Sequence, residues 1–184
     1  MKIACIGWGS LIWKPESLKI QRQWFNDGPF IPLEFVRQSE NGRLTLVINN
    51  SSKTVRSLWA LMDTEEIGDA VSSLAKRESI KSKNVEKHIG VLEKTDDAKN
   101  PIVKDLKEWV LTLKLDAVIW TSLEPKFNNE PNKIPTLQEA LQYLSNLEIQ
   151  KRRVAEEYIR RAPKQIDTLY RQAFEAEFNW THLA

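Results

Sequence analysis

Cysteine is nearly absent from this sequence, since Cys5 is the one cysteine among 184 residues. A single thiol cannot form an internal disulfide, which fits a reducing compartment. No apolar run approaches the roughly 20 residues of a membrane-spanning helix. The opening MKIACIGW is interrupted by Gly7 and Gly9 too early to be a signal peptide. We therefore expect a soluble, cytoplasmic protein with no membrane partner.

An excess of one sign of charge is also absent, because 27 Lys and Arg stand against 25 Asp and Glu, a formal net charge of +2. Nothing in this balance requires nucleic acid or an anionic membrane as a partner. Two short basic runs, at 151–153 and 160–161, alternate with the acidic residues Glu148, Glu156 and Glu157, which is typical of a solvated helix face. No metal-ligand cluster is visible either. We expect no nucleic acid, no metal and no cofactor.

The length and the 41% hydrophobic content favour one globular domain over residues 1–184. Strands are expected at 2–7, in a hairpin at 33–48 turning at Asn41-Gly42, at 55–63 and at 116–123. Helices are expected at 64–79, 136–146, 148–162 and 165–178, and loops at 26–32, 94–101 and 124–135. Strands first and helices last indicate the α+β class, as a small mixed β-barrel or sheet flanked by helices.

Local patterns make further predictions about side chains. Asp63 and Glu66 have the spacing of an N-cap residue and its reciprocal partner at the start of the 64–79 helix. Leu33, Phe35 and Arg37 alternate along the hairpin, so we expect Arg37 to lie on the same buried face. A stripe of helical period in the last helix should pack on the sheet; it consists of Ile166, Leu169, Tyr170, Ala173 and Phe174.

The opening stretch "KIACIGWGSLIW", residues 2–13, runs from an apolar strand into two glycines. It is not a dinucleotide fingerprint, because Ile12 occupies the place of the third glycine and Pro15 interrupts the helix that should follow. It is not a nucleophile elbow, because Ser10 lacks glycines two residues before and after it. Two interpretations stay open: a strand-terminating turn, or main-chain N–H groups that bind an anion. No triad order includes either histidine, and both are expected at the surface: His88 and His182.

Glu78 falls on the apolar side of the helix expected at 64–79. At 100° per residue it lies near the middle of the stripe of Ile67, Ala70, Val71, Leu74 and Ala75. A carboxylate directed at a core is costly unless it is paired or neutralised, and such carboxylates are candidate acid–base groups. The alternative is that the helix ends here, so that Glu78 reaches water or pairs with an arginine.

Three segments together resemble the gamma-glutamylcyclotransferase-like superfamily, and more closely its ChaC branch. Residues 8–13, Trp-Gly-Ser-Leu-Ile-Trp, are similar to the Tyr-Gly-Ser-Leu signature of that branch, with Trp8 in place of the tyrosine. "LAKRE", residues 74–78, is similar to the pattern that contains the family's catalytic glutamate, and "FVRQSENGRLTLVI" between them resembles its arginine-bearing hairpin. The resemblance covers roughly residues 2–80. A later segment, "APKQIDTLYRQA", is similar to one whose tyrosine lines the family's pocket.

The resemblance implies a cyclotransferase that releases 5-oxoproline from a small gamma-glutamyl peptide or amine, chemistry that belongs to glutathione metabolism. The α-amine of the substrate would attack its own γ-carbonyl, and Glu78 would carry the proton from the amine to the leaving nitrogen. N–H groups of the opening loop would hold the substrate carboxylate or the γ-oxyanion. The implied substrate-binding residues are Trp8, Gly9, Ser10, Leu11, Arg37 and Tyr170.

A second hypothesis keeps the same fold as a non-catalytic module that binds a ligand or a protein partner. Trp8, Trp13 and Trp24 would then form an aromatic surface instead of a pocket wall. A pocket with Glu78 close to the backbone of residues 9–11 would favour the enzyme, whereas a pair between Glu78 and an arginine without such a pocket would favour the module.

Overall fold

The computed structural model describes residues 1–96 and 105–183 of the chain. As far as they are described, the residues form two compact units. The first consists of residues 1–7, 14–31 and 56–123, and the second of residues 8–13, 32–55 and 124–184. The expectation of one domain over residues 1–184 stays a prediction.

The chain belongs to the α+β class, as the sequence predicts. The described residues contain two mixed sheets and six α-helices. One sheet has four strands and the other five, and the strand orders leave both sheets open instead of closing them into a barrel. Of the two forms expected, the flanked sheet is therefore present and the small barrel is not.

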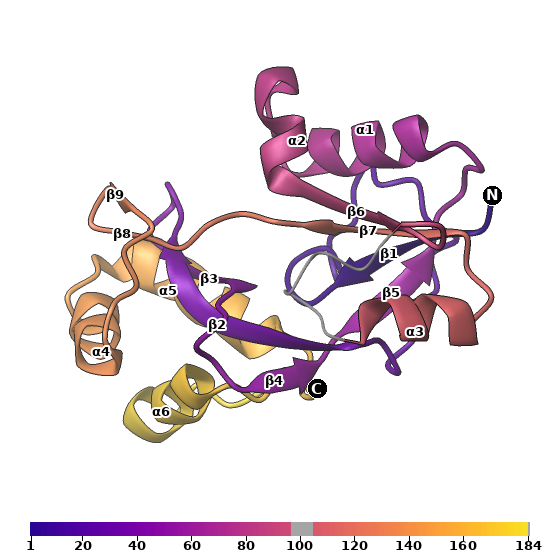
Figure 1. Ribbon diagram of the computed structural model, residues 1–184. Helices are drawn as coiled ribbons and strands as arrows, with labels where there is room; N and C mark the ends of the chain where they lie inside the picture. The colour runs from indigo at the N-terminus through magenta and orange to yellow at the C-terminus, as the bar shows by residue number, and fades with distance from the viewer. Residues whose placement is uncertain (97–104, 184) are drawn as a thin grey trace. The chain divides into compact units, whose positions relative to one another are not determined.

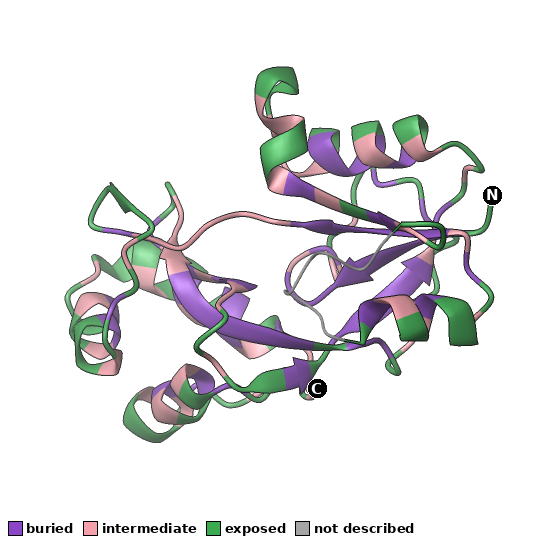
Figure 2. Ribbon diagram, in the orientation of Figure 1, coloured by how far each residue is buried: buried purple, intermediate pink, exposed green. Residues whose placement is uncertain are grey.

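The sheet of the first unit has the strand order β5-β1-β7-β6. Its strands are β1 (Ile3–Gly7), β5 (Leu58–Leu61), β6 (Ile89–Glu93) and β7 (Ala117–Thr121). β1 runs parallel to β7, while the β1–β5 and β6–β7 pairs are antiparallel. Every residue of β1 and β7 is buried (Figure 2), because both strands are interior to the sheet, and this explains their uninterrupted apolar sequences. The strands expected at 2–7 and 116–123 are confirmed.

The helices of the first unit are α1 (Ile67–Arg77), α2 (Val85–His88) and α3 (Leu106–Thr112). Figure 1 shows α1 and α3 on opposite sides of the sheet. α1 begins three residues later than expected, because Glu66 is its extended N-cap residue and makes no side-chain cap. The predicted Asp63–Glu66 cap is therefore wrong, and the N–H of Asp63 donates to the Lys19 carbonyl instead.

The second unit contains a sheet of order β3-β2-β8-β9, with β4 paired to β2. Its strands are β2 (Phe30–Gln38), β3 (Leu44–Ile48), β4 (Thr54–Arg56), β8 (Lys126–Phe127) and β9 (Glu130–Pro131). β2 and β3 form the expected antiparallel hairpin, and Gly42 in its turn has a φ of 80°. The strand expected at 55–63 is instead divided at Ser57 into β4 and β5. The connection expected at 124–135 contains the short β8–β9 hairpin.

The helices of the second unit are α4 (Leu137–Ser145), α5 (Ile149–Arg161) and α6 (Leu169–Phe178), which confirms the three late helices. α4 begins with a reciprocal cap between Thr136 and Glu139. α6 begins four residues later than expected, because the Thr168 side chain caps it at that point. Leu169 is consequently 60% exposed and is not part of the buried stripe, whereas Ile166 and Phe174 are fully buried.

The loop expected at 94–101 is described only in part. β6 ends at Glu93, residues 94–96 form a turn, and the rest of that loop lies outside the described residues. Among the described residues, no helix combines the length and apolar character needed to cross a membrane.

Candidate functional site

The opening turn, Trp8–Trp13, follows β1 and belongs to the second unit. The N–H of Ile12 donates to the Gly9 carbonyl at 3.0 Å and closes a four-residue turn. Gly9 and Leu11 are buried, and Ser10 is half-buried. A turn is therefore present at the predicted place, and anion binding by its N–H groups stays a prediction.

Gly9 lies directly against the hydroxyl of Tyr158 in α5. A β-carbon on Gly9 would lie 2.6 Å from Tyr158 Oη, which is closer than real β-carbons approach. Among the described residues Gly42 is the one glycine with a positive φ, so Gly9 is required for space and not for its backbone angles. Tyr158 is 6% exposed, and its Oη accepts the Leu46 N–H at 3.3 Å. Sequence reasoning missed Tyr158, although the apolar spacing of Ala155, Tyr158 and Ile159 marks the buried face of α5.

Trp8 is a core residue of the second unit. Its side chain is 6% exposed, and Nε1 donates to the Leu46 carbonyl at 3.2 Å. Trp13, half-buried, meets the Tyr158 ring edge-on with the centroids 5.6 Å apart. The idea that Trp8 forms part of an exposed aromatic surface is therefore wrong. Trp24 belongs to the first unit and is half-buried.

The sequence predicted Arg37 on the same face of β2 as Phe35, and this prediction is wrong. Phe35 pairs with Leu46, but the register then shifts and Arg37 pairs with Thr45. Paired residues share a face and neighbouring residues alternate, so this bulge places Arg37 on the opposite face. Arg37 is half-buried, and Nη1 donates to the Glu124 carbonyl at 2.5 Å. Burial lowers the pKa of its guanidinium.

Arg43 follows the hairpin turn and precedes β3, and it is the arginine that lies next to Tyr158. Its guanidinium carbon is 5.2 Å from the centroid of the Tyr158 ring. Nε is buried and has no hydrogen-bond partner among the described residues. Sequence reasoning missed Arg43, although it lies in the family-like hairpin, because sequence alone does not show which hairpin residue faces α5.

Tyr170 lies in the first turn of α6, beside the buried carboxylate of Glu34. Its N–H donates to Glu34 Oε2 at 3.3 Å, and its hydroxyl donates to the Pro135 carbonyl at 2.6 Å. Glu34 is 3% exposed and also accepts the Thr168 hydroxyl at 2.6 Å. Burial raises the pKa of Glu34, and burial together with the Glu34 charge raises the pKa of Tyr170. The hydroxyl of Tyr170 therefore anchors the chain before α4, and a substrate role for it stays a prediction.

Glu78 belongs to the first unit and is the C-cap residue of α1. Its Oε1 accepts Arg77 Nη1 at 2.8 Å, and the two side chains are 18% and 10% exposed. Arg77 is held in turn, because its Nε and Nη2 donate to the Lys14 carbonyl at 3.1 and 2.9 Å. The helix thus ends at Glu78, and the carboxylate pairs with an arginine, as the structural alternative proposed. Its role in proton transfer stays a prediction.

Cys5 in β1 does not provide a nucleophile. The residue is fully buried, and burial, followed by the negative charge of Glu78, raises the pKa of its thiol. Within residues 1–96 and 105–183 no group of three or more His, Cys, Asp or Glu side chains could hold a metal ion.

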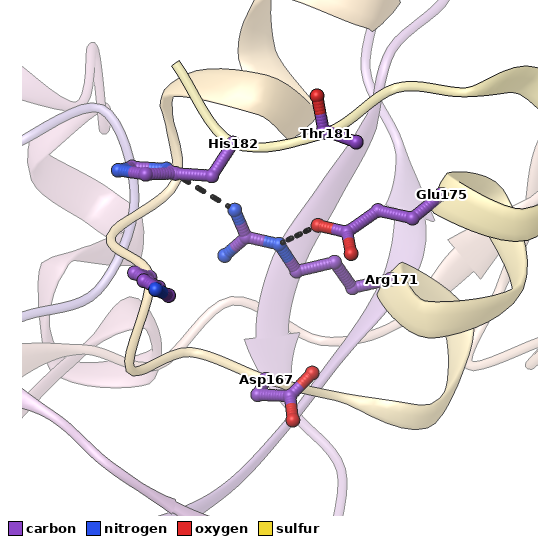
Figure 3. A pocket seen from close by; sticks show the side chains of 6 residues that line it. Asp167, Arg171, Glu175, Thr181 and His182 are labelled. Atoms are coloured by element: carbon purple, nitrogen blue, oxygen red, sulfur yellow. Dashed lines mark hydrogen bonds and ion pairs between the residues drawn. The ribbon is translucent and has the colours of Figure 1, made fainter. Parts of the chain in front are cut away.

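A polar cavity of about 560 Å³ lies in the second unit (Figure 3). It is lined by Lys164, Asp167, Arg171, Glu175, Thr181 and His182. None of these is a site residue that the sequence predicted. Arg171 is 2% exposed and lies between Glu175 and His182. It donates to Glu175 Oε1 at 3.2 Å and to the Pro163 and Ile166 carbonyls at 2.7 and 3.2 Å. These bonds tie α6 to the connection before it. His182, expected at the surface, is half-buried.

The basic runs of α5 are occupied by contacts within the second unit. Ion pairs join Lys151 to Glu148, Arg160 to Glu156 and Arg161 to Glu157. The Arg152 guanidinium stacks over Phe178 and Trp180. These contacts agree with a solvated helix face.

Comparisons of this chain with protein families, with characterised proteins and with solved structures find no match.

Proposed function

We propose that this chain has a gamma-glutamylcyclotransferase-like fold and releases 5-oxoproline from a small gamma-glutamyl peptide or amine in a reducing cytoplasm. The main support is the fixed position of the Glu78 carboxylate. It is 18% exposed and is bound at 2.8 Å by Arg77, whose guanidinium is itself held by the Lys14 carbonyl. A general acid–base group must be held in position to be effective, and Glu78 meets that requirement.

The proposed reaction is intramolecular. The substrate α-amine attacks the γ-carbonyl carbon and forms a five-membered lactam, while the bond from that carbon to the leaving nitrogen breaks. Glu78 takes the proton that the amine loses and gives it to the leaving nitrogen, so the products are 5-oxoproline and a free amine. No water is consumed and no acyl-enzyme forms. A base of this kind contributes roughly 10²–10⁴-fold to the rate.

In this proposal the opening turn supplies donors and no nucleophile. The N–H groups around Gly9, Ser10 and Leu11 stabilise the anionic parts of the reacting substrate. Gly9 is closely packed on Tyr158, which gives the backbone of the turn a fixed position from which to donate.

The Arg77–Glu78 ion pair is also the observation that favours a second candidate function. A partly buried ion pair can serve the structure alone. In that case the same fold would bind a small ligand or a protein partner without turning it over.

A screen of gamma-glutamyl compounds tests the proposal. The purified chain is incubated with gamma-glutamyl dipeptides, glutathione and gamma-glutamyl amines, and 5-oxoproline and the released amine are measured by mass spectrometry. We expect equimolar 5-oxoproline and amine from at least one compound. Binding of a gamma-glutamyl compound without any release would establish the second candidate, and neither binding nor release would refute both.

A further inference from the structure

Arg43 has a positive charge that the described residues leave unmatched. Its side chain forms no ion pair with a described Asp or Glu, and its buried Nε has no acceptor among them. A buried guanidinium nitrogen without an acceptor is costly, and folded proteins satisfy the great majority of such groups. The hairpin therefore retains at this position a donor that the described chain itself does not use.

The position of this cation is fixed by its surroundings. The Arg43 N–H donates to Ser39 Oγ at 3.2 Å, and its carbonyl accepts the Ser39 N–H at 2.9 Å. The guanidinium lies 5.2 Å from the Tyr158 centroid, within the range of a cation–π interaction. A planar guanidinium placed in advance can bind a carboxylate through two parallel hydrogen bonds, which an ammonium group cannot do.

Tyr158 brings Arg43 and the opening turn to the same side chain. Arg43 lies over the face of the ring, while Gly9 lies against the hydroxyl and Trp13 against the ring edge-on. The Arg43 guanidinium and the backbone of the opening turn thus both lie against the Tyr158 side chain.

From this arrangement we infer that Arg43 binds the α-carboxylate of the substrate, which leaves the N–H groups of the opening turn for the oxygen of the γ-carbonyl. The inference rests on the proposed function and makes it more specific. Substrates with a free α-carboxylate are then preferred over compounds without one. Arg37, one of the substrate-binding residues that the resemblance implies, already donates to the Glu124 carbonyl.

The test compares two substrates that differ only in this carboxylate. One is a gamma-glutamyl amide that the screen shows to be turned over, and the other is the 4-aminobutanoyl amide of the same amine, which would cyclise to 2-pyrrolidinone. Both are assayed with the wild type, with Arg43→Met and with Arg153→Met, an exposed arginine on α5 that serves as the matched control. Methionine keeps an apolar stem on Tyr158 and removes the charge.

We expect the wild type to prefer the gamma-glutamyl amide by about 10- to 100-fold in kcat/KM, the effect of hydrogen bonds to a charged group. Arg43→Met should lose that preference through a higher KM and leave the 4-aminobutanoyl amide unaffected, while Arg153→Met should change neither. Binding of 5-oxoproline and of 2-pyrrolidinone, followed by NMR titration, should show the same pattern without turnover. If Arg43→Met does not fold, Arg43→Lys replaces it and should lose part of the preference.

An unchanged preference in the Arg43 variant would overturn the inference, and so would an equal loss for both substrates, because Arg43 would then only support the fold. The proposed function would survive either result. If the wild type releases no 5-oxoproline, the proposed function fails and the inference fails with it. The screen with the wild type shows this before any variant is made.

Discussion

Gly9 and Tyr158 fit together because the first residue has no side chain where the second has its hydroxyl. A β-carbon on Gly9 would lie 2.6 Å from Oη but 3.5 Å from Cζ, so the hydroxyl is the group with which a side chain at this position would clash. The contact joins the turn after β1 to α5. The position of the opening turn therefore depends on a helix that comes much later in the chain.

Replacement of Gly9 by alanine should destabilise the protein through this contact. We expect a loss of about 1–3 kcal/mol in the free energy of unfolding, the usual effect of overpacking a core. Tyr158→Phe alone should lose about 1 kcal/mol, because the Leu46 N–H loses its acceptor. In the double variant the phenyl ring leaves room for the new methyl group, so the two losses should not add. Urea unfolding of all four proteins measures the coupling, and strictly additive losses would show that Oη does not restrict Gly9.

Ser10→Ala should remain active, because the proposed donors are backbone N–H groups that this change leaves in place. We expect a loss of about 10-fold or less in kcat/KM, the effect of about one hydrogen bond. Gly9→Val should do far more damage, because its branched β-carbon cannot fit beside Tyr158. Ser51→Ala, in an exposed turn of the same unit, is the control. A covalent adduct on Ser10, detected by mass spectrometry, would make the turn an acyl-transfer site instead.

Glu34 should make stability decrease as the pH rises. Burial raises its pKa in the folded protein above the ordinary value of 4.5, so the folded state binds the proton more strongly than the unfolded chain. The stabilisation by this proton is fully present below the unfolded pKa and is lost as the pH rises through the folded pKa. Glu34→Gln does not titrate. The unfolding free energy of the wild type minus that of Glu34→Gln should therefore fall with increasing pH, by at most about 1.4 kcal/mol per pH unit.

Urea unfolding between about pH 4 and pH 8 measures this difference, since Asp and Glu ordinarily titrate near the lower end of that range. Glu40→Gln is the matched control, because Glu40 is exposed in the turn between β2 and β3. A difference that rises with pH would mean that the hydrogen bonds from Thr168 and Tyr170 outweigh the burial of Glu34.

The sequence predicted those parts of the fold that depend on neighbours along the chain. The strand at 2–7, the Asn41-Gly42 hairpin and the late helices have clear periodicity and turn residues, and all three are present. β6 was not predicted, since Gly90 interrupts its pattern. The indole of Trp120 on β7 occupies the space where a β-carbon of Gly90 would be, which is a cross-strand contact with no local signal.

The residues of the candidate site could be predicted only where the signal lies within one stretch of sequence. Motif spacing selected Gly9 and Glu78 from single stretches of sequence. The bulge after Phe35, which turns Arg37 to the other face, depends on the pairing of two strands and leaves no mark in the alternation of β2. The contact of Arg43 with Tyr158 joins the β2–β3 hairpin connection to α5, so neither residue could be recognised from its own segment.

Release of 5-oxoproline by Glu78→Gln, compared with the wild type, tests the central claim most directly. Glutamine has nearly the same volume as glutamate but cannot accept the proton of the amine. Glu66→Gln is the matched control, because Glu66 is exposed at the other end of α1 and makes no side-chain cap. We expect Glu78→Gln to lose at least about 100-fold in kcat with an unchanged circular dichroism spectrum, and Glu66→Gln to keep the wild-type rate. Near-normal release of 5-oxoproline by a folded Glu78→Gln protein would contradict the proposed mechanism.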